Sequence, residues 1–198
     1  MRRKQFEVKD KTIIEEILND SEYGTFALAL DNKPYSIPVN FVYKDDIIYF
    51  HGAKKGKKKD YILENSLASF SVAQPYSLIQ SYFGDKDALA SDATHFFKSV
   101  CCDGKITIVE NYEEKVKALA LIMKKFQPEG QYKPLADEIY RKMINATEVF
   151  RFDIEEIVAK IKVGQNLSEE KFNSVIESLE KRGTPTDKLT IKFMKEFR

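Results

Sequence analysis

The stretch Pro34–Lys58, PYSIPVNFVYKDDIIYFHGAKKGKK, decides the fold expected for this chain. From Tyr35 to Tyr43 every second residue is a bulky apolar or aromatic one, a period of two that is typical of a half-buried strand. The polar turn 44–46 separates this run from a second β-rich run, 47–50. Two such runs joined by a short polar turn predict a β-hairpin at the centre of the fold.

The second of these strands leads directly into a basic helix start. Residues 51–53 end the strand, and five lysines then surround Gly56 ahead of a helix-like run. The free N–H groups and the positive dipole end of a helix N-terminus favour a phosphate, and Lys57 and Lys58 add full charges there. The charge pattern alone is equally typical of a solvated lysine turn.

The motifs of this stretch resemble those of a known family. They are similar to the flavin-binding core of the pyridoxamine 5'-phosphate oxidase-like, FMN-binding split-barrel family, and within it to the 5-nitroimidazole-resistance (Nim-type) branch. The matching residues are Pro34-Tyr35, Pro38-Val39-Asn40, Tyr43, Tyr49-Phe50-His51, Ala53 and Gly56-Lys57-Lys58. Gly52 stands where the branch usually has Ser, which removes one hydroxyl contact to the cofactor. The resemblance implies an α+β fold that is mainly β: an FMN-binding split β-barrel with peripheral helices.

The same resemblance implies a flavin site with FMN as the cofactor. The cofactor-binding residues would be Pro38, Val39, Asn40, His51, Gly52, Ala53, Gly56, Lys57, Lys58, Ser99 and Val100. Ser99 and Val100 match a Y-R-S-V strand, with Phe97 and Lys98 in place of Tyr and Arg, which in such dimers comes from the other subunit. We therefore expect a homodimer with the flavin at the subunit interface.

Two of these residues have a plainer interpretation. Asn40 would lie beside the polar rim of the isoalloxazine ring, or would be an ordinary polar residue of an edge strand. His51 would lie near the reactive face of the flavin and is the candidate catalytic residue, although a histidine at a strand end is more often a structural hydrogen-bonding group.

The function implied is that of an FMN-dependent oxidoreductase of Nim type. FMN would take electrons from NAD(P)H or another donor and pass them to a small-molecule acceptor, with nitro compounds as candidates. The chain has no Trp and so lacks the Arg and Trp substrate motif of true pyridoxamine 5'-phosphate oxidases, which disfavours vitamin B6 oxidation.

A binding protein without turnover is the alternative. The segment 162–168, KVGQNLS, is similar to the tail of FMN-binding negative transcriptional regulators of the same superfamily. A haem-binding relative is the other alternative, with His51 and His95 as the candidate axial ligands. DNA binding is disfavoured because no helix-turn-helix is evident and the charge is balanced.

The rest of the chain divides into a barrel domain, 1–163, and a helical C-terminal extension, 164–198, packed on the barrel or on the dimer interface. The periodicity predicts helices from residue 10 or 11 to 20, over 112–126, from Pro134 to about 144, from Ser168 to Arg182 and over 186–198. Strands are predicted at 24–30, 68–72, 95–102, 105–109, 147–154 and 157–163, with a turn or bulge at Asp103-Gly104. Segment 74–94 is expected to be irregular, with one edge strand at 78–83.

Composition limits the remaining classes of function. Lys and Arg total 32 against 31 Asp and Glu, so no general nucleic-acid or membrane surface is indicated. No apolar run approaches the length of a membrane span, and a soluble, cytoplasmic protein is expected. Cys101 and Cys102 are adjacent, which makes a mutual disulfide geometrically poor. The two histidines have no ligand-type residues at metal spacing, so no metal site is expected.

Overall fold

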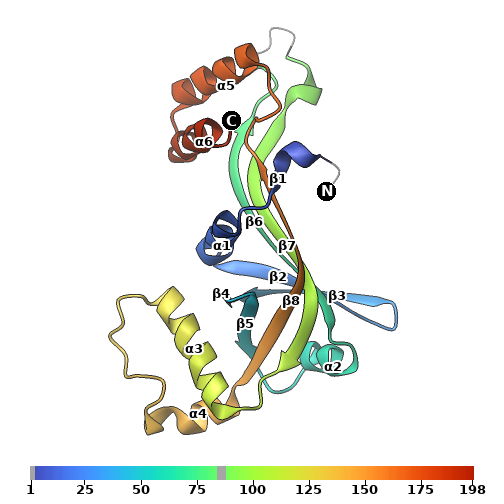
Figure 1. Ribbon diagram of the computed structural model, residues 1–198, viewed down its shortest axis with the longest axis vertical. Helices are drawn as coiled ribbons and strands as arrows, with labels where there is room; N and C mark the ends of the chain where they lie inside the picture. Colours follow the sequence, from blue (N-terminus) through green and yellow to red (C-terminus); the bar gives the residue numbers. More distant parts are fainter. Residues whose placement is uncertain (1–2, 84–87) are drawn as a thin grey trace. The chain divides into compact units, whose positions relative to one another are not determined.

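The computed structural model describes residues 3–83 and 88–198, and these residues form an α+β fold (Figure 1). Their strands are β1 (Glu7–Val8), β2 (Tyr23–Leu30), β3 (Lys33–Asn40), β4 (Val42–Lys44), β5 (Ile47–Gly52), β6 (Leu67–Ile79), β7 (Thr94–Ile108) and β8 (Glu148–Lys162). The α-helices are α1 (Lys11–Asp20), α2 (Lys57–Glu64), α3 (Tyr112–Phe126), α4 (Arg141–Ala146), α5 (Glu169–Arg182) and α6 (Pro185–Glu196). Three short 3-10 helices, η1 (Lys4–Phe6), η2 (Ala90–Asp92) and η3 (Glu138–Tyr140), complete the list.

The strands pair in one sheet with the order β3-β2-β6-β7-β8-β5-β4, and β1 pairs with β8. The ladders β2–β3, β2–β6, β4–β5, β5–β8 and β1–β8 are antiparallel. β3, at one end of this order, also lies close to β5, near the other end. The sheet is therefore curved, so that strands far apart in its order approach each other.

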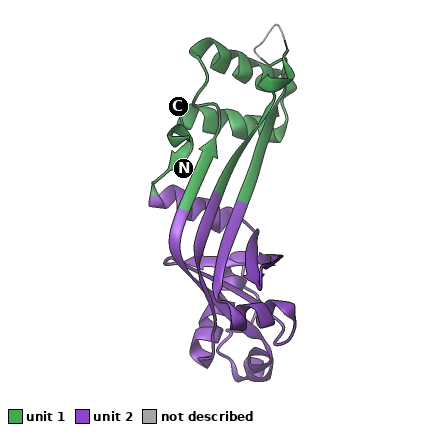
Figure 2. Cartoon of the chain, turned by 90° about the vertical axis from the view of Figure 1, so that its right-hand side faces the viewer, with its two compact units in different colours: residues 1–10, 73–99, 158–198 green, residues 11–72, 100–157 purple. Residues whose placement is uncertain are grey.

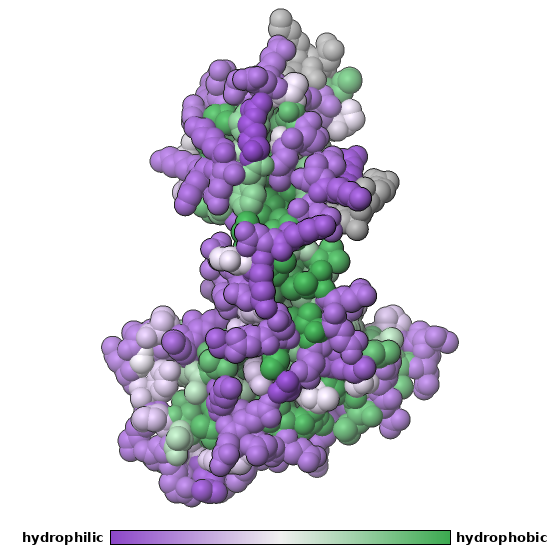
Figure 3. All heavy atoms as spheres, viewed as in Figure 1, coloured by the Kyte–Doolittle hydropathy of each residue, from purple (hydrophilic) through white to green (hydrophobic). Residues whose placement is uncertain are grey.

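The chain divides into two compact units (Figure 2). Unit 1 comprises residues 1–10, 73–99 and 158–198, and unit 2 comprises residues 11–72 and 100–157. Strands β6, β7 and β8 each contribute residues to both units. On the face shown in Figure 3, hydrophilic side chains cover most of each unit and hydrophobic ones form smaller patches. The assignment of 1–163 and 164–198 as domains stays a prediction.

Unit 2 is built around a cluster of phenylalanine rings. Phe26 lies at its centre, with ring centroids 4.7 Å from Phe50, 4.6 Å from Phe70 and 5.2 Å from Phe152. Phe50 also stacks on Phe150 at 4.8 Å. These rings are fully buried, and they come from β2, β5, β6 and β8. These rings lie on the inner side of the curved sheet, and their contacts hold its strands together.

Unit 1 contains the two C-terminal helices, and each begins with a side-chain cap. The Ser168 hydroxyl accepts a hydrogen bond from the Lys171 N–H at the start of α5. Thr184 and Asp187 form a reciprocal capping box at the start of α6. The apolar face of α5, with Val175 and Leu179 fully buried, provides much of the core of this unit.

The predicted hairpin differs from the observed one. Strand β3 ends at Asn40 and pairs with β2, and only β4 pairs with β5. The break lies at Phe41, which is fully buried with its ring 4.8 Å from Phe70. The alternation of residues 35–43 is real, but the chain leaves one ladder and joins another at the point where Phe41 enters the core.

Strands β6 and β8 are longer than the sequence predicted. β6 continues to Ile79 through a segment expected to be irregular; its ladder with β2 ends at Ser71, so Pro75 costs no hydrogen bond in that ladder. β8 runs unbroken over the two strands predicted at 147–154 and 157–163. Of the edge strand predicted at 78–83, only 78–79 are extended, as the end of β6. The part of the irregular segment at 84–87 lies outside the described residues.

The predicted turn at Asp103-Gly104 is part of β7. A Cβ added at Gly104 would lie 2.1 Å from the Asp153 carbonyl oxygen, so the glycine permits a close approach of β8 and makes no turn. Cys101 and Cys102, just before it, are both free thiols, the first exposed and the second buried.

The helix expected from Pro134 begins later. The Asp137 side chain accepts a hydrogen bond from the Ile139 N–H, and this cap starts η3, which leads into α4. The other predicted helices are confirmed, with α3 and α5 at the predicted bounds.

Candidate functional site

The end of β5 and the start of α2 are joined by the loop 53–56. Gly56 is the N-cap residue of α2 with φ +118°, a backbone conformation that favours glycine. No atom lies within 4 Å of a Cβ placed there, so the glycine is needed for its conformation and not for space. The Lys59 and Asp60 N–H groups donate hydrogen bonds to the Gly56 carbonyl. The N–H groups of residues 57 and 58 come before these first helical hydrogen bonds in the chain and take no part in them.

One of the lysines at this helix start is neutralised within the chain. The Lys59 ammonium lies 2.5 Å from Glu148 Oε2, and the Lys115 ammonium lies 3.8 Å from Glu148 Oε1. Glu148 is buried and pairs in register with Gly52 at the end of β5. Lys59 therefore secures the helix to β8, and its charge is not available to a ligand.

Lys57 and Lys58 lie instead over aromatic rings. The Lys57 ammonium is 4.5 Å from the ring centroid of Tyr35 and 5.3 Å from that of Tyr61. The Lys58 ammonium is 4.9 Å from the ring centroid of Phe150. Among residues 3–83 and 88–198, no carboxylate forms an ion pair with either lysine. The start of α2 therefore carries two positive charges without a countercharge.

Gly52 permits this position of Lys58. A Cβ added at Gly52 would lie 2.2 Å from the Lys58 Nζ, so a serine there would displace the ammonium group. Burial lowers the pKa of Lys58. The glycine at residue 52 thus removes a hydroxyl group that could contact the cofactor, and it also makes room for the Lys58 ammonium at the same strand end.

His51 lies beside this lysine. Burial of part of the imidazole, followed by repulsion from Lys58, lowers the pKa of His51 below its ordinary value of 6.5. The neutral form of the imidazole is therefore favoured at pH 7. In that state it can exchange hydrogen bonds with a ligand but carries no extra proton to deliver.

The β3 residues of the predicted site belong to the same unit. The Asn40 amide donates a hydrogen bond to the Glu22 carbonyl at 3.1 Å, as an ordinary polar residue of a strand would. Pro38 is exposed, and Val39 pairs with Gly24 of β2. The strand reaches α2 through Tyr35, whose ring centroid is 5.3 Å from that of Tyr61.

Ser99 and Val100 lie in β7, and the boundary between the two units passes between them. The Val100 side chain is fully buried within its own chain, which leaves only its backbone for contact with a cofactor. Ser99 belongs to unit 1, whereas residues 38–40 and 51–58 belong to unit 2. The role of both residues in a partner's flavin site stays a prediction.

A model of the family described as pyridoxamine 5'-phosphate oxidase matches residues 10–161. The chain belongs to this family. The match spans the strands β2 to β7, nearly all of β8 and the helix α2, so it includes every residue of the predicted flavin site. The family expected from the sequence is thereby confirmed.

Relatives extend this comparison. The chain is 23% identical over 203 residues to the protease synthase and sporulation protein PAI 2 of Bacillus subtilis (strain 168), covering 98% of this chain and 95% of that protein. Among solved structures, it is similar to a Bacteroides thetaiotaomicron protein described as a candidate 5-nitroimidazole antibiotic resistance protein, with a TM-score of 0.64, 22% identity and coverage of 78% and 86%.

It is also similar to the FAD and heme binding protein of Mycobacterium smegmatis, with a TM-score of 0.65, 17% identity and coverage of 79% of this chain and 73% of that one. At these identities the structures show a common fold, and they confirm the α+β split-barrel fold of the pyridoxamine 5'-phosphate oxidase family.

The sequence did not predict the ion pair with Glu148 that sets Lys59 apart from Lys57 and Lys58. Glu148, Phe150 and Phe152 alternate along β8 and so lie on the same face of the strand. Because the two rings are apolar, this pattern indicates that the Glu148 carboxylate is also buried. Nothing local connects it to Lys59, 89 positions earlier. Within the described ranges, no group of three or more His, Cys, Asp or Glu residues is placed to hold a metal, and no helix is long and apolar enough to span a membrane.

Proposed function

We propose that this chain is an FMN-binding flavoprotein that works as an FMN-dependent oxidoreductase. One observation carries the proposal: in a member of the pyridoxamine 5'-phosphate oxidase family, two lysine ammonium groups lie at the start of α2 with no ion-pair partner among the described residues. The solved relative described as binding FAD and heme supports a flavin as the ligand class. A homodimer, NAD(P)H as a donor and a small-molecule acceptor belong to the same proposal.

A phosphate is the ligand group that this helix start fits best. The positive end of the α2 dipole and the free N–H groups of residues 57 and 58 favour an anion. A cation–π contact contributes about 0.5–1 kcal/mol at an exposed site such as that of Lys57, and about 2 kcal/mol where the cation is desolvated, as the half-buried Lys58 partly is. A hydrogen bond to a charged phosphate contributes about 1.5–3 kcal/mol, so the exchange favours Lys57 clearly and Lys58 less.

Bound FMN supplies the redox chemistry, and the protein binds and orients it. Lys57 and Lys58 would hold the phosphate, and the glycine at residue 56 keeps side-chain atoms away from it. The neutral imidazole of His51 would offer one hydrogen-bond donor and one acceptor beside the same strand end. The Asn40 amide oxygen remains an acceptor, because only the amide nitrogen is used for the Glu22 carbonyl.

A non-catalytic flavin-dependent regulator is the second candidate. The similarity to the sporulation protein PAI 2 covers 98% of this chain and so includes segment 162–168 and the helices that follow. A haem-binding role has less support: His95 Nε2 lies 2.9 Å from the Tyr76 carbonyl oxygen, which occupies one ring nitrogen and leaves His51 as the more accessible candidate ligand.

Titration of the protein with FMN, followed by visible absorbance, tests the proposal. The double variant Lys57→Ala/Lys58→Ala loses two charge-assisted hydrogen bonds and should bind FMN roughly 100-fold more weakly. The matched control is Lys117→Ala/Lys124→Ala, which removes the same charge from exposed positions of α3 in the same unit. The Lys57→Ala/Lys58→Ala variant should bind riboflavin, which lacks the phosphate, as well as the unchanged protein does.

Each result has a defined consequence. Equal FMN affinities of the two double variants would refute the phosphate site, and no uptake of flavin would refute the flavoprotein. A single intense haem band on the purified protein would favour the haem-binding alternative. If FMN binds, but the bound flavin passes no electrons to nitro compounds or quinones after reduction by NAD(P)H or dithionite, the regulator is favoured over the oxidoreductase.

A further inference from the structure

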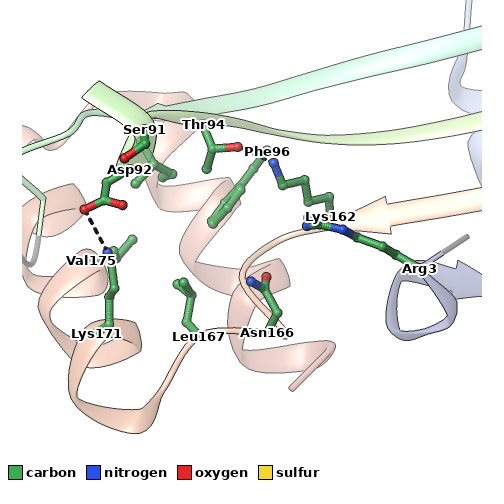
Figure 4. A pocket seen from close by; sticks show the side chains of 11 residues that line it. Arg3, Ser91, Asp92, Thr94, Phe96, Lys162, Asn166, Leu167, Lys171 and Val175 are labelled. Carbon is green, nitrogen blue, oxygen red and sulfur yellow. Dashed lines mark hydrogen bonds and ion pairs between the residues drawn. The ribbon is translucent and has the colours of Figure 1, made fainter. Parts of the chain in front are cut away.

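Unit 1 contains a cavity of about 260 Å³, and none of its lining residues belongs to the proposed flavin site (Figure 4). It is enclosed by the start of the chain, by residues before and within β7, by the end of β8 and by the segment that leads into α5. Its lining residues are Arg3, Ile79, Ser91, Asp92, Thr94, Phe96, Lys162, Asn166, Leu167, Lys171 and Val175. All of them belong to unit 1.

The charge in this cavity is positive. Lys171 lies 3.4 Å from the Asp92 carboxylate, which offsets its charge. Arg3, the residue before η1, and Lys162, the last residue of β8, extend into the same space, as Figure 4 shows. In the part of the chain that the structure describes, neither of these two has an ion-pair partner. Among the residues that the structure describes, the cavity therefore holds two positive charges without a countercharge.

The surroundings of Lys162 disfavour its positive charge. Its ammonium donates a hydrogen bond to the Thr94 hydroxyl, which is neutral. Burial, then repulsion from Lys160 and Arg3, lowers the pKa of Lys162. An anion between Arg3 and Lys162 would remove this repulsion, because each positive charge would gain an opposite charge nearby.

The walls and the size of the cavity limit the ligand further. Leu167 provides an apolar surface, with the buried Phe96 and Val175 behind it, and Thr94 and Asn166 add a hydroxyl and an amide. A volume of about 260 Å³ is below the range of about 300–1,000 Å³ that is usual for drug-sized ligands. The cavity thus suits a small molecule with one charged end and a short apolar body.

The segment 162–168, singled out in the sequence, builds this cavity. The Gln165 side chain accepts a hydrogen bond from the Val163 N–H and donates one to the Ile161 carbonyl, both at 2.9 Å. Gly164 has φ +92°, and a Cβ there would lie 3.2 Å from the Phe96 ring. These residues fix the turn that presents Lys162 and Asn166 to the same space, which gives the motif a role outside the flavin site.

We propose that this cavity binds a small organic anion, with its carboxylate or phosphate group between Arg3 and Lys162 and its apolar body against Leu167, behind which Phe96 and Val175 lie buried. Guanidinium and ammonium groups recognise both head groups through charge-assisted hydrogen bonds. The lining of this cavity shares no residue with the proposed flavin site.

The test uses the full-length protein with labelled Leu and Val methyl groups, observed by NMR. Benzoate and phenyl phosphate are the anionic probes, and benzyl alcohol is a neutral molecule of similar size. Both anions should shift the Leu167 and Val175 methyl signals in a saturable way, and the tighter of the two identifies the preferred head group. Benzyl alcohol should produce no saturable shift of these signals.

Variants connect the shifts to the two cations. Lys162→Gln should weaken binding of the anions roughly tenfold, since it removes one charged hydrogen-bonding partner. Arg3→Gln should have a similar effect, and because Arg3 is exposed this second variant does not threaten folding. Lys188→Gln removes the same charge from an exposed position of α6 in unit 1 and should leave binding unchanged.

The proposal is overturned if neither anion shifts these methyl signals. It is equally overturned if benzyl alcohol binds as well as benzoate, or if Lys162→Gln and Arg3→Gln both bind the anions as Lys188→Gln does. Failure of FMN binding at α2 leaves these outcomes unchanged.

Discussion

Asp187 is the buried link between α5, α6 and β6, and Asp187→Asn tests how much that link stabilises unit 1. Its carboxylate accepts hydrogen bonds from Arg182 Nη2 at 2.5 Å, Arg182 Nε at 2.9 Å and Ser77 Oγ at 2.5 Å. It also accepts from the Thr184 N–H at 3.1 Å, within the capping box. The side chain is completely inaccessible to solvent.

The size of the effect follows from the charge. An asparagine keeps an oxygen for Thr184 but leaves the Arg182 guanidinium without its counterion. Loss of one partner of a buried ion pair costs about 3–5 kcal/mol, and the lower end applies because the Arg182 side chain is 29% exposed. For a chain of 198 residues, about 3 kcal/mol corresponds to a decrease in Tm of about 6–12 °C.

Urea unfolding followed by circular dichroism at pH 7 measures the loss of unfolding free energy. Glu180→Gln is the matched control, because it removes one negative charge from an exposed position of α5. Arg182 and the hydroxyl donors hold the pKa of Asp187 well below its ordinary value of 3.8. The stabilisation by the carboxylate is therefore complete above pH 3.8 and is lost as the pH falls below that value towards the folded-state pKa.

The difference between the unchanged protein and Asp187→Asn should thus narrow as the pH falls below about 4. A destabilisation no larger than that of Glu180→Gln would refute the buried-link argument. A difference that is as large at pH 3 as at pH 7 would show that the lost charge is not its cause.

Two further predictions concern the candidate site and its support. Lys58→Met should raise the pKa of His51, measured from the imidazole signals by NMR, while Lys57→Met should not; equal effects of both variants would contradict the placement of Lys58 beside the strand end. Burial and a hydrogen bond to Glu114 raise the pKa of Tyr49 to about 12, and Glu114→Gln should lower it in an ultraviolet pH titration. The control Glu113→Gln, at an exposed position of α3, should leave the pKa of Tyr49 unchanged. If Glu113→Gln also lowered it, the cause would be the general loss of negative charge and not the hydrogen bond.

Helices were the part of this fold that the sequence predicted best, because their signals are local. Asn111 caps α3, and its apolar residues repeat along one face, so both ends of this helix could be predicted. The start of α5 at Ser168 and its end before Gly183 were readable for the same reason.

Strand partners were predicted less well, because alternation records which face is buried and not which neighbour is paired. Residues 35–43 alternate without interruption, yet β3 pairs with β2 and β4 pairs with β5. Asp103-Gly104 is a common turn sequence, yet here the glycine serves the contact with Asp153 across β7 and β8. Both differences depend on contacts with distant segments of the chain.

The candidate site shows the same limit in its charges. Five lysines surround Gly56 in the sequence, and no local signal ranks them. The fold separates them: Glu148, opposite Gly52 in the ladder, neutralises Lys59, whereas Lys57 and Lys58 remain over aromatic rings. A buried carboxylate at the strand end thus fixes the third residue of α2 to the sheet and leaves the first two charges for an anion. If this division of roles is correct, Glu148→Gln should destabilise the fold more than it changes FMN affinity, whereas removal of Lys57 and Lys58 should do the reverse.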